Sequence, residues 1–201
     1  MYTQPPTMRM LVDVDEVLSN FGSYVLESAG SYFQEKAAKH SGHSWDFFEI
    51  FSPEEQNFLH EMIEKEGFCA SIPLQKGAQE AVRELRKLVD VYVVTSPYHS
   101  MPWVHERNQW LKEHFGFGKN EIVHTSAKFL VNGDIFLDDK PDNVLSWHKE
   151  HPRGLAMIWP SPFTRSMPVD FVRDWGHVLG RVSQKVLVRQ LVADHHNRKG
   201  D

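Results

Sequence analysis

The stretch from Met8 to Leu18, MRMLVDVDEVL, decides the fold. Residues 8–12 contain four apolar side chains and lead directly into a turn that holds Asp13 and Asp15. A short apolar run that ends in acidic residues is typical of a buried strand with polar groups at its carboxyl end. We therefore expect a strand here and a candidate site immediately after it.

The composition fits one ordinary globular domain, or one domain with a small insertion. The chain has 201 residues, of which 41% are hydrophobic and 24% charged, so a disordered or fibrous protein is not expected. Its formal net charge of -5 lacks the basic excess that binding to a nucleic-acid polymer needs. The single Cys69 fits a reducing compartment, and no apolar run is long enough for a membrane span. Because residues 1–10 lack a signal-peptide pattern, we expect a cytoplasmic protein.

After residue 73, helix and strand patterns alternate along the chain. Apolar residues at helical spacing predict helices at 77–88, 101–115 and about 170–192. Short β-branched or apolar runs predict strands at 89–95, 121–124, 134–137 and 154–159. This alternation predicts an α/β fold, with a Rossmann-like parallel sheet that has helices on both faces.

Residues 21–72 have a different pattern, with two predicted helices and no strand. The helices are expected at 24–40 and 53–65, and an aromatic cluster lies between them. Because this segment follows the first strand directly, it would lie above the carboxyl edge of the sheet as a small helical cap. We therefore expect an α/β core domain made of residues 1–20 and 73–201, and a cap domain made of residues 21–72.

Polar residues also end two later strands of the predicted sheet. One strand ends at Thr95-Ser96 and the other at Asp138-Asp139. The carboxyl ends of parallel strands meet at one edge, where ligands bind, so both pairs should lie near the first acidic turn. Taken alone, each motif also fits an ordinary solvated turn or a turn before a helix.

Four carboxylates at one edge would repel one another unless some are protonated or a cation lies among them. Carboxylate oxygens of this kind suit Mg²⁺. No zinc site is expected, because His60 lacks the second histidine of an HExxH motif. We therefore predict a magnesium site whose candidate ligands are Asp13, Asp15, Asp138 and Asp139.

The motifs occur in a characteristic order: an Asp-x-Asp turn, a Thr-Ser strand end, Lys128 and an Asp-Asp pair. This order resembles the haloacid dehalogenase superfamily of phosphotransferases, and the matching stretches are LVDVDEVLSNF, VYVVTSP, Lys128 and IFLDDKPDN. A helical insertion after the first motif is similar to that superfamily's first type of cap. More narrowly, DVDEVLSNF with its Phe21, the TSP turn and DDKPDN resemble the 5′(3′)-deoxyribonucleotidases. The resemblance covers roughly residues 8–180.

The resemblance implies a Mg²⁺-dependent phosphomonoesterase that acts on (deoxy)nucleoside monophosphates through an aspartyl-phosphate. It makes Asp13 the nucleophile and Asp15 the general acid and base. It makes Thr95 and Lys128 the groups that stabilise charge on the transferred phosphoryl group. Of the Asp138-Asp139 pair it favours the second residue as the direct metal ligand, and both stay candidates.

The resemblance also implies a substrate site that reaches into the cap. Aromatic faces stack on bases, so the cap rings are candidates for the base pocket, although they also fit a small core of the cap itself. The candidate substrate-binding residues are Phe21, Phe47, Phe48, Ile63, Thr95, Ser96 and Lys128.

The sequence departs from the family at Glu16, where the first motif usually has glycine. If the Glu16 carboxylate faced the phosphate, two like charges at ~4 Å would cost ~1 kcal/mol in water and more in a dry site. We therefore expect Glu16 to point away from the phosphate and to contact the cap or the bound sugar.

Two other interpretations stay open. The first is a phosphatase of the same superfamily that acts on another small phosphoester. The second is a non-catalytic nucleotide-binding protein on the same fold, which the intact nucleophile Asp13 and its neighbours argue against. The oligomeric state stays open between a monomer and a homodimer.

Overall fold

The computed structural model describes residues 7–40, 42, 44–164 and 171–199. Its centre is a five-stranded, fully parallel sheet with the order β3-β2-β1-β4-β5. Each strand lies within one residue of its predicted bounds, so the predicted α/β fold is confirmed. The strands are β1 (Arg9–Val12), β2 (Asp90–Thr95), β3 (Ile122–His124), β4 (Ile135–Asp138) and β5 (Leu155–Ile158).

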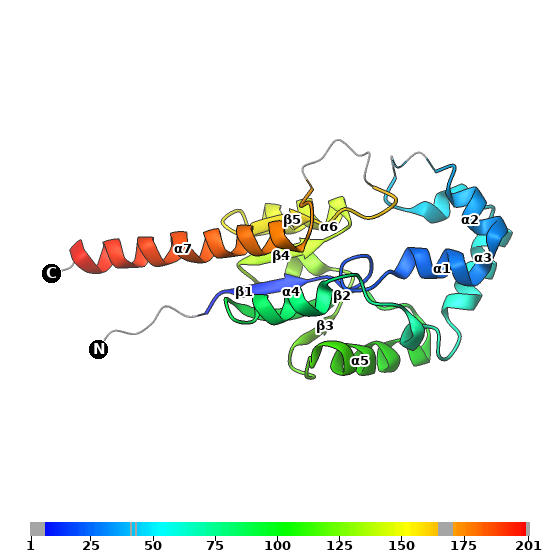
Figure 1. Ribbon diagram of the computed structural model, residues 1–201, viewed down its shortest axis with the longest axis horizontal. Helices are drawn as coiled ribbons and strands as arrows, with labels where there is room; N and C mark the ends of the chain where they lie inside the picture. The colour runs from blue at the N-terminus through cyan, green and yellow to red at the C-terminus, as the bar shows by residue number, and fades with distance from the viewer. Residues whose placement is uncertain (1–6, 41, 43, 165–170, 200–201) are drawn as a thin grey trace.

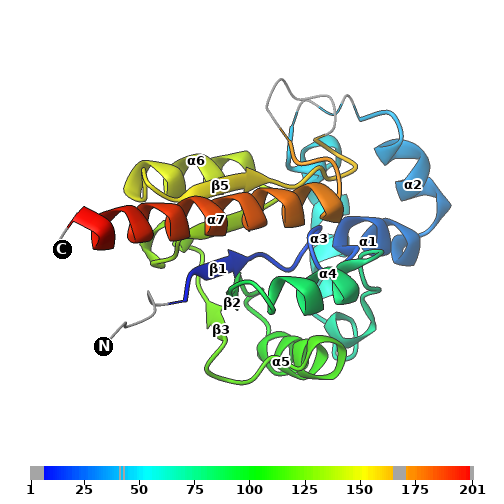
Figure 2. The same cartoon turned by 60° about the vertical axis from the view of Figure 1, so that its left-hand side comes forward.

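Helices cover both faces of the sheet because the strand side chains alternate between the faces. Met10 and Val12 share one buried cluster with residues of α4 (Ala78–Leu85), α5 (Met101–Phe115) and α7 (Trp175–Lys199). Leu11 faces the opposite way and packs with Trp147 of α6 (Pro141–Glu150). Figures 1 and 2 show α4 and α7 side by side over the sheet.

Between β1 and α4 the chain forms a group of helices beyond the carboxyl ends of the strands (Figure 1). These elements are α1 (Phe21–Ala29), α2 (Ser31–Ala37), η1 (Phe47–Ile50), α3 (Pro53–Ile63) and η2 (Cys69–Ser71). They have a buried cluster of their own, which Trp103 of α5 and Phe163 join. The domain boundaries expected at 20/21 and 72/73 stay a prediction, although the two clusters have separate members.

The helices predicted at 53–65 and 77–88 end earlier than expected, at Ile63 and Leu85, and two others differ more. The helix expected at 24–40 is divided at Gly30, whose φ of 101° is open to glycine and strained for other residues. The last helix begins at Trp175, where the Asp174 carboxylate accepts a hydrogen bond from the His177 N–H at 2.7 Å, and it continues to Lys199. Its expected start at Asp170 lies outside the described residues. Over the described ranges, no helix has the length and apolar character that crossing a membrane requires.

Candidate active site

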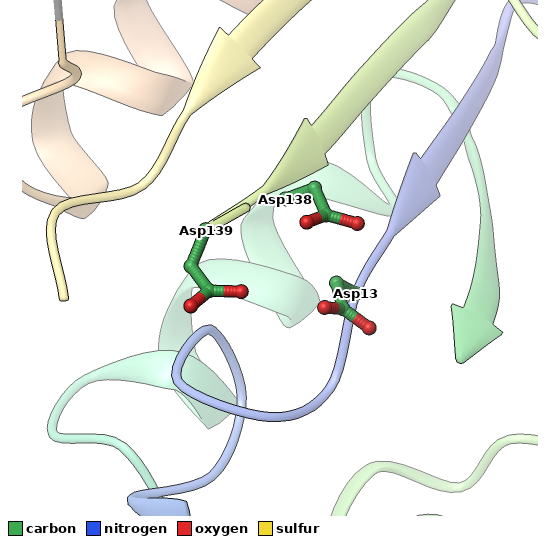
Figure 3. A group of neighbouring side chains, drawn as sticks. All are labelled: Asp13, Asp138 and Asp139. Carbon is green, nitrogen blue, oxygen red and sulfur yellow. The ribbon is translucent and has the colours of Figure 1, made fainter. Parts of the chain in front are cut away.

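Three carboxylates meet where β1 and β4 end. The pairing of these strands brings the Asp13 N–H to the Leu137 carbonyl at 2.9 Å, so Asp13 lies beside Asp138. Oxygen atoms of Asp13, Asp138 and Asp139 all lie within 4.8 Å of one another, and all three residues are buried. Figure 3 shows their carboxylates facing a common space. Asp13 of the first acidic turn therefore lies next to the Asp138-Asp139 pair, as the sequence predicted.

Lys128 supplies the positive charge of this group. It begins the short helix η3 (Lys128–Leu130) and is 3% exposed. Its Nζ lies 2.7 Å from Asp13 Oδ1 and 2.8 Å from Asp138 Oδ2. Burial alone would lower the pKa of Lys128, but the two carboxylates raise it above its ordinary value. Lys128 therefore stays charged and holds the two aspartates in place.

The electrostatics of the group favour a cation. Burial raises the pKa of Asp13 to about 7, against the opposing effect of Lys128. Burial, and then the charge of Asp138, raise the pKa of Asp139 well above its ordinary value. The donors are all carboxylate oxygens, which suits a hard ion such as Mg²⁺. The residues therefore fit a divalent cation.

Asp138 and Asp139 differ in what their oxygens contact. Both oxygens of Asp138 are occupied: Oδ2 accepts from Lys128, Oδ1 from the Lys140 N–H at 2.8 Å, and the Asn143 amide contacts both. Asp139 Oδ2 accepts one hydrogen bond, from the Trp45 indole N–H at 2.5 Å. Asp139 therefore has the greater capacity to bind an ion.

Asp15 does not join the other three carboxylates, in contrast to the predicted ligand set. Its Oδ1 accepts hydrogen bonds from Arg107 at 2.7 Å and from the Ser19 hydroxyl at 3.0 Å. Asp15 thus forms an ion pair with Arg107 and is not one of the three residues whose carboxylate oxygens lie within 4.8 Å of one another. The carboxylate is thus left for a role other than metal binding.

Thr95 and Ser96 lie at the end of β2, at the same edge of the sheet. The Thr95 hydroxyl is buried and has no hydrogen-bond partner among the residues that the structure describes. Ser96 lines the adjacent cavity, and its hydroxyl donates to the Thr125 carbonyl at 3.4 Å. The Thr95 hydroxyl can therefore donate to an oxygen that enters this edge, whereas the Ser96 hydroxyl would first have to leave the Thr125 carbonyl.

A cavity of about 460 Å³ opens beside the acidic group. Of the predicted residues, Asp13, Asp15, Phe21, Phe47, Phe48, Ser96, Lys128 and Asp139 line it. Thr95, Asp138 and Ile63 do not line it, and Ile63 is fully buried among the cap side chains. Several further residues line the cavity without having been predicted as site residues, and those that carry rings are Trp45, His60, Tyr98 and Phe163.

Stacked rings form the walls of this cavity. Phe47 stacks on Phe163, with ring centres 4.4 Å apart, and Phe48 lies parallel to His60 at 5.1 Å. Phe163 follows β5 closely, so the rule that ligands bind beyond strand ends could have indicated it. His60 offered no signal in the sequence apart from its place in the cap.

The expected contact of Glu16 with the cap is found, but Glu16 also lines the cavity together with Asp13 and Asp139, and its pointing away from the phosphate stays a prediction. Its Oε1 accepts a hydrogen bond from the Gly22 N–H in the first turn of α1, at 2.5 Å. Its φ of 62° is left-handed, which explains why glycine is common at this position of the motif. Glu16 is 6% exposed, and burial raises its pKa to about 7. The residue thus connects the catalytic turn to α1.

The fold is that of the haloacid dehalogenase-like hydrolases of known structure. Such a hydrolase from Burkholderia xenovorans has a TM-score of 0.55 and 12% identity, with 90% of this chain and 99% of that chain covered. A second such hydrolase, from Xanthomonas campestris, has a TM-score of 0.56 and 12% identity, with 92% of this chain and 94% of that chain covered. At this identity the likeness shows the fold alone.

Sequence similarity identifies the family. Residues 7–187 match the model of the 5′ nucleotidase, deoxy (Pyrimidine), cytosolic type C protein family. The human 5′(3′)-deoxyribonucleotidase, cytosolic type, is 30% identical over 194 residues, which cover 86% of this chain and 94% of the relative. The 5′(3′)-deoxyribonucleotidase of Clostridium acetobutylicum is 23% identical over 167 residues, which cover 82% and 88%. The chain therefore belongs to this family and is a phosphatase of the 5′-nucleotidase type.

Proposed function

We propose that this protein hydrolyses deoxyribonucleoside monophosphates in a Mg²⁺-dependent reaction that passes through an aspartyl-phosphate. The observation that supports this best is the group of Asp13, Asp139 and Lys128 at one end of a cavity whose other walls are stacked rings. A bound divalent cation would neutralise phosphate charge and align the phosphate for in-line attack. Asp13 and Asp139 would hold this cation.

In the first step, a carboxylate oxygen of Asp13 attacks phosphorus as the bond from phosphorus to the sugar oxygen breaks. Asp15 donates its proton to the departing sugar oxygen. Lys128 and the Thr95 hydroxyl stabilise negative charge on the transferred group. The products are the nucleoside and a phosphorylated Asp13.

In the second step, water hydrolyses the phosphorylated Asp13. Asp15, ionised after the first step, accepts a proton from the attacking water. Phosphate leaves, and both aspartates return to their starting state. Asp138 takes no direct part, because its oxygens hold Lys128, the Lys140 N–H and Asn143.

The size and lining of the cavity favour a nucleotide as the substrate rather than a smaller phosphoester. Its volume of about 460 Å³ lies within the range of sites for drug-sized ligands. Phe48 is half-buried beside the rings of Phe47 and His60 and borders the cavity, so the exposed part of its ring can contact a base. The human relative is named cytosolic type, and we extend the expectation of a cytoplasmic location from it.

The test is phosphate release from deoxyribo- and ribonucleoside 5′- and 3′-monophosphates, with p-nitrophenyl phosphate as a small reference ester. We expect release from deoxyribonucleotides with Mg²⁺, and its loss with EDTA. Protein carrying Asp13→Asn, purified in parallel, controls for contaminating phosphatases. Hydrolysis of the small ester alone would favour another phosphoester as substrate, and activity that persists in EDTA would contradict the metal site.

A further inference from the structure

We propose that Arg107 is the positioning residue for Asp15, and that it determines which oxygen of Asp15 transfers the proton. This inference rests on the proposed function, in which Asp15 is the general acid and base. Arg107 lies on α5, 92 residues after Asp15 in the sequence. It belongs to none of the sequence motifs that resemble the haloacid dehalogenase superfamily.

The hydrogen bonds to Asp15 are unequal between its two oxygens. Arg107 Nη2 and the Ser19 hydroxyl both donate to Oδ1, at 2.7 and 3.0 Å. Within the described part of the chain, no donor reaches Oδ2. Asp15 also lines the cavity that would hold the substrate. Two donors therefore fix Oδ1 and leave Oδ2 available to the leaving group.

The surroundings of Arg107 indicate that its charge serves Asp15. The side chain is 0% exposed, and its guanidinium carbon lies 5.0 Å from the ring centre of Trp103 and 5.5 Å from that of Trp110. Its Nε and Nη1 are buried and have no hydrogen-bond partner among the described residues. Burying a guanidinium in this way is costly unless an opposite charge compensates it, and Asp15 is the carboxylate in contact.

This arrangement matters most when the bond to the sugar breaks. A sugar alkoxide is a poor leaving group and needs the proton of Asp15 as it departs, whereas p-nitrophenolate leaves without one. The proton moves to the sugar oxygen, and Asp15 becomes ionised beside the guanidinium of Arg107. Loss of Arg107 should therefore slow the cleavage of alkyl esters selectively.

The experiment compares kcat/KM for a deoxyribonucleoside monophosphate with kcat/KM for p-nitrophenyl phosphate. This parameter covers the steps through formation of the phosphorylated Asp13 and excludes its later hydrolysis. Arg107→Met should lose about 10- to 100-fold on the nucleotide, as part of the 10²- to 10⁴-fold that general acids contribute. Its loss on p-nitrophenyl phosphate should stay within about threefold. The matched control is Lys112→Met, which removes an exposed cation from the same helix.

Two further variants keep the test decisive. Arg107→Lys retains the charge and should recover part of the nucleotide activity, which also covers the case in which Arg107→Met fails to fold. In an Asp15→Asn background, adding Arg107→Met should cause little further loss, because the two residues act as a unit.

Equal losses on both substrates in a folded variant, or fully additive losses in the double variant, would overturn the role of Arg107. They would leave the proposed function intact. A wild-type protein that released no phosphate from any nucleotide would instead overturn both proposals.

Discussion

At the scale of single residues, the charge balance of the site depends on Lys128. Its ammonium contacts Asp13 and Asp138, and Asp139 lies within 4.8 Å of both. With all three carboxylates ionised, one lysine leaves the group with an excess of negative charge. An anionic phosphate could not approach this group unless a cation were added. Burial is the main cause of the raised pKa values of Asp13 and Asp139, and the neighbouring carboxylates raise them further.

The nucleophile gives the first prediction. Asp13→Asn keeps the size of the side chain but removes the charge that, in the proposed mechanism, attacks phosphorus. We expect kcat to fall by at least about three orders of magnitude, as when other covalent nucleophiles are removed. Steady-state phosphate release measures this, with the exposed Asp142→Asn on α6 as a matched control. Near-normal turnover by a folded Asp13→Asn protein would rule out the aspartyl-phosphate route.

Glu16 gives the second prediction. Glu16→Gly and Glu16→Ala both remove the hydrogen bond to Gly22, but only glycine relieves the left-handed backbone. The glycine variant should therefore be more stable to urea than the alanine variant by about 1 kcal/mol. Both variants should keep Mg²⁺ binding, measured calorimetrically, and should raise KM for nucleotides because the turn is no longer tied to α1. Loss of Mg²⁺ binding in Glu16→Gly would make Glu16 a ligand and would contradict the assigned site.

At the scale of elements, the rings of η1 have different surroundings. Phe47 is 5% exposed and packs in the cap cluster against Phe51 and Phe163. Phe48 is half-buried beside His60 at the cavity. The sequence left two roles open for these rings, a base pocket and a core of the cap. The surroundings of Phe47 fit the cap core, and those of Phe48 fit the base pocket.

The third prediction separates these two roles. Phe48→Ala should raise KM for nucleotides more than for p-nitrophenyl phosphate, since stacking supplies roughly 1–3 kcal/mol per base at other sites. Phe47→Ala should mainly reduce stability, by about 3–5 kcal/mol as for other buried phenylalanines. Phe58→Ala, on a ring that is 48% exposed and outside the cavity, is the control. If Phe48→Ala affected both substrates equally, the ring would belong to the cap core.

The strands and their acidic ends could be predicted because each is encoded locally. Residues 8–15 contain both the buried run and the carboxylates that follow it, so one stretch determines strand and site together. The division of the helix at Gly30 could not be predicted from the sequence, because helices tolerate single glycines. The turn at Gly30 is required only by the way α1 and α2 pack.

Arg107 could not be recognised because its role depends on contacts between distant elements. The surrounding HERNQ sequence resembles a solvated helix face. A weak signal was present, since Trp103, Arg107 and Trp110 follow the i, i+4, i+7 spacing of a buried stripe. A cation on such a stripe indicates a buried partner, but the identity of Asp15 as that partner emerges only from the structure.

At the scale of the whole molecule, we expect metal binding and folding to be coupled through buried carboxylates. In the metal-free protein, Asp13 and Glu16 each have a pKa of about 7, and that of Asp139 is also raised. The folded state therefore holds protons that the unfolded chain releases above its ordinary carboxylate pKa values near 4. Because these pKa values are raised on folding, their stabilisation is complete below about pH 4 and is lost as pH rises towards 7.

The fourth prediction follows from this coupling. Without metal, these carboxylates should make the protein progressively less stable between about pH 4 and pH 7. In the proposed site Mg²⁺ would bind the ionised carboxylates of the folded state, so it should raise Tm more at pH 8 than at pH 5. At about 100 times its Kd it should add roughly 2.7 kcal/mol, which corresponds to about 5–11 °C for a chain of this size. Thermal melts in EDTA and in MgCl₂ at both pH values provide the measurement.

The control for this experiment is Asp139→Asn, which removes one proposed ligand and leaves the contacts of Lys128 with Asp13 and Asp138 in place. This variant should lose most of the Mg²⁺-induced rise in Tm at pH 8. It should also be less sensitive to pH without metal, because one of the raised carboxylates is gone. An equal rise in Tm at both pH values would mean that Mg²⁺ does not compete with protons at this site. A melt unmoved by millimolar Mg²⁺ at pH 8 would show that the three carboxylates do not bind it.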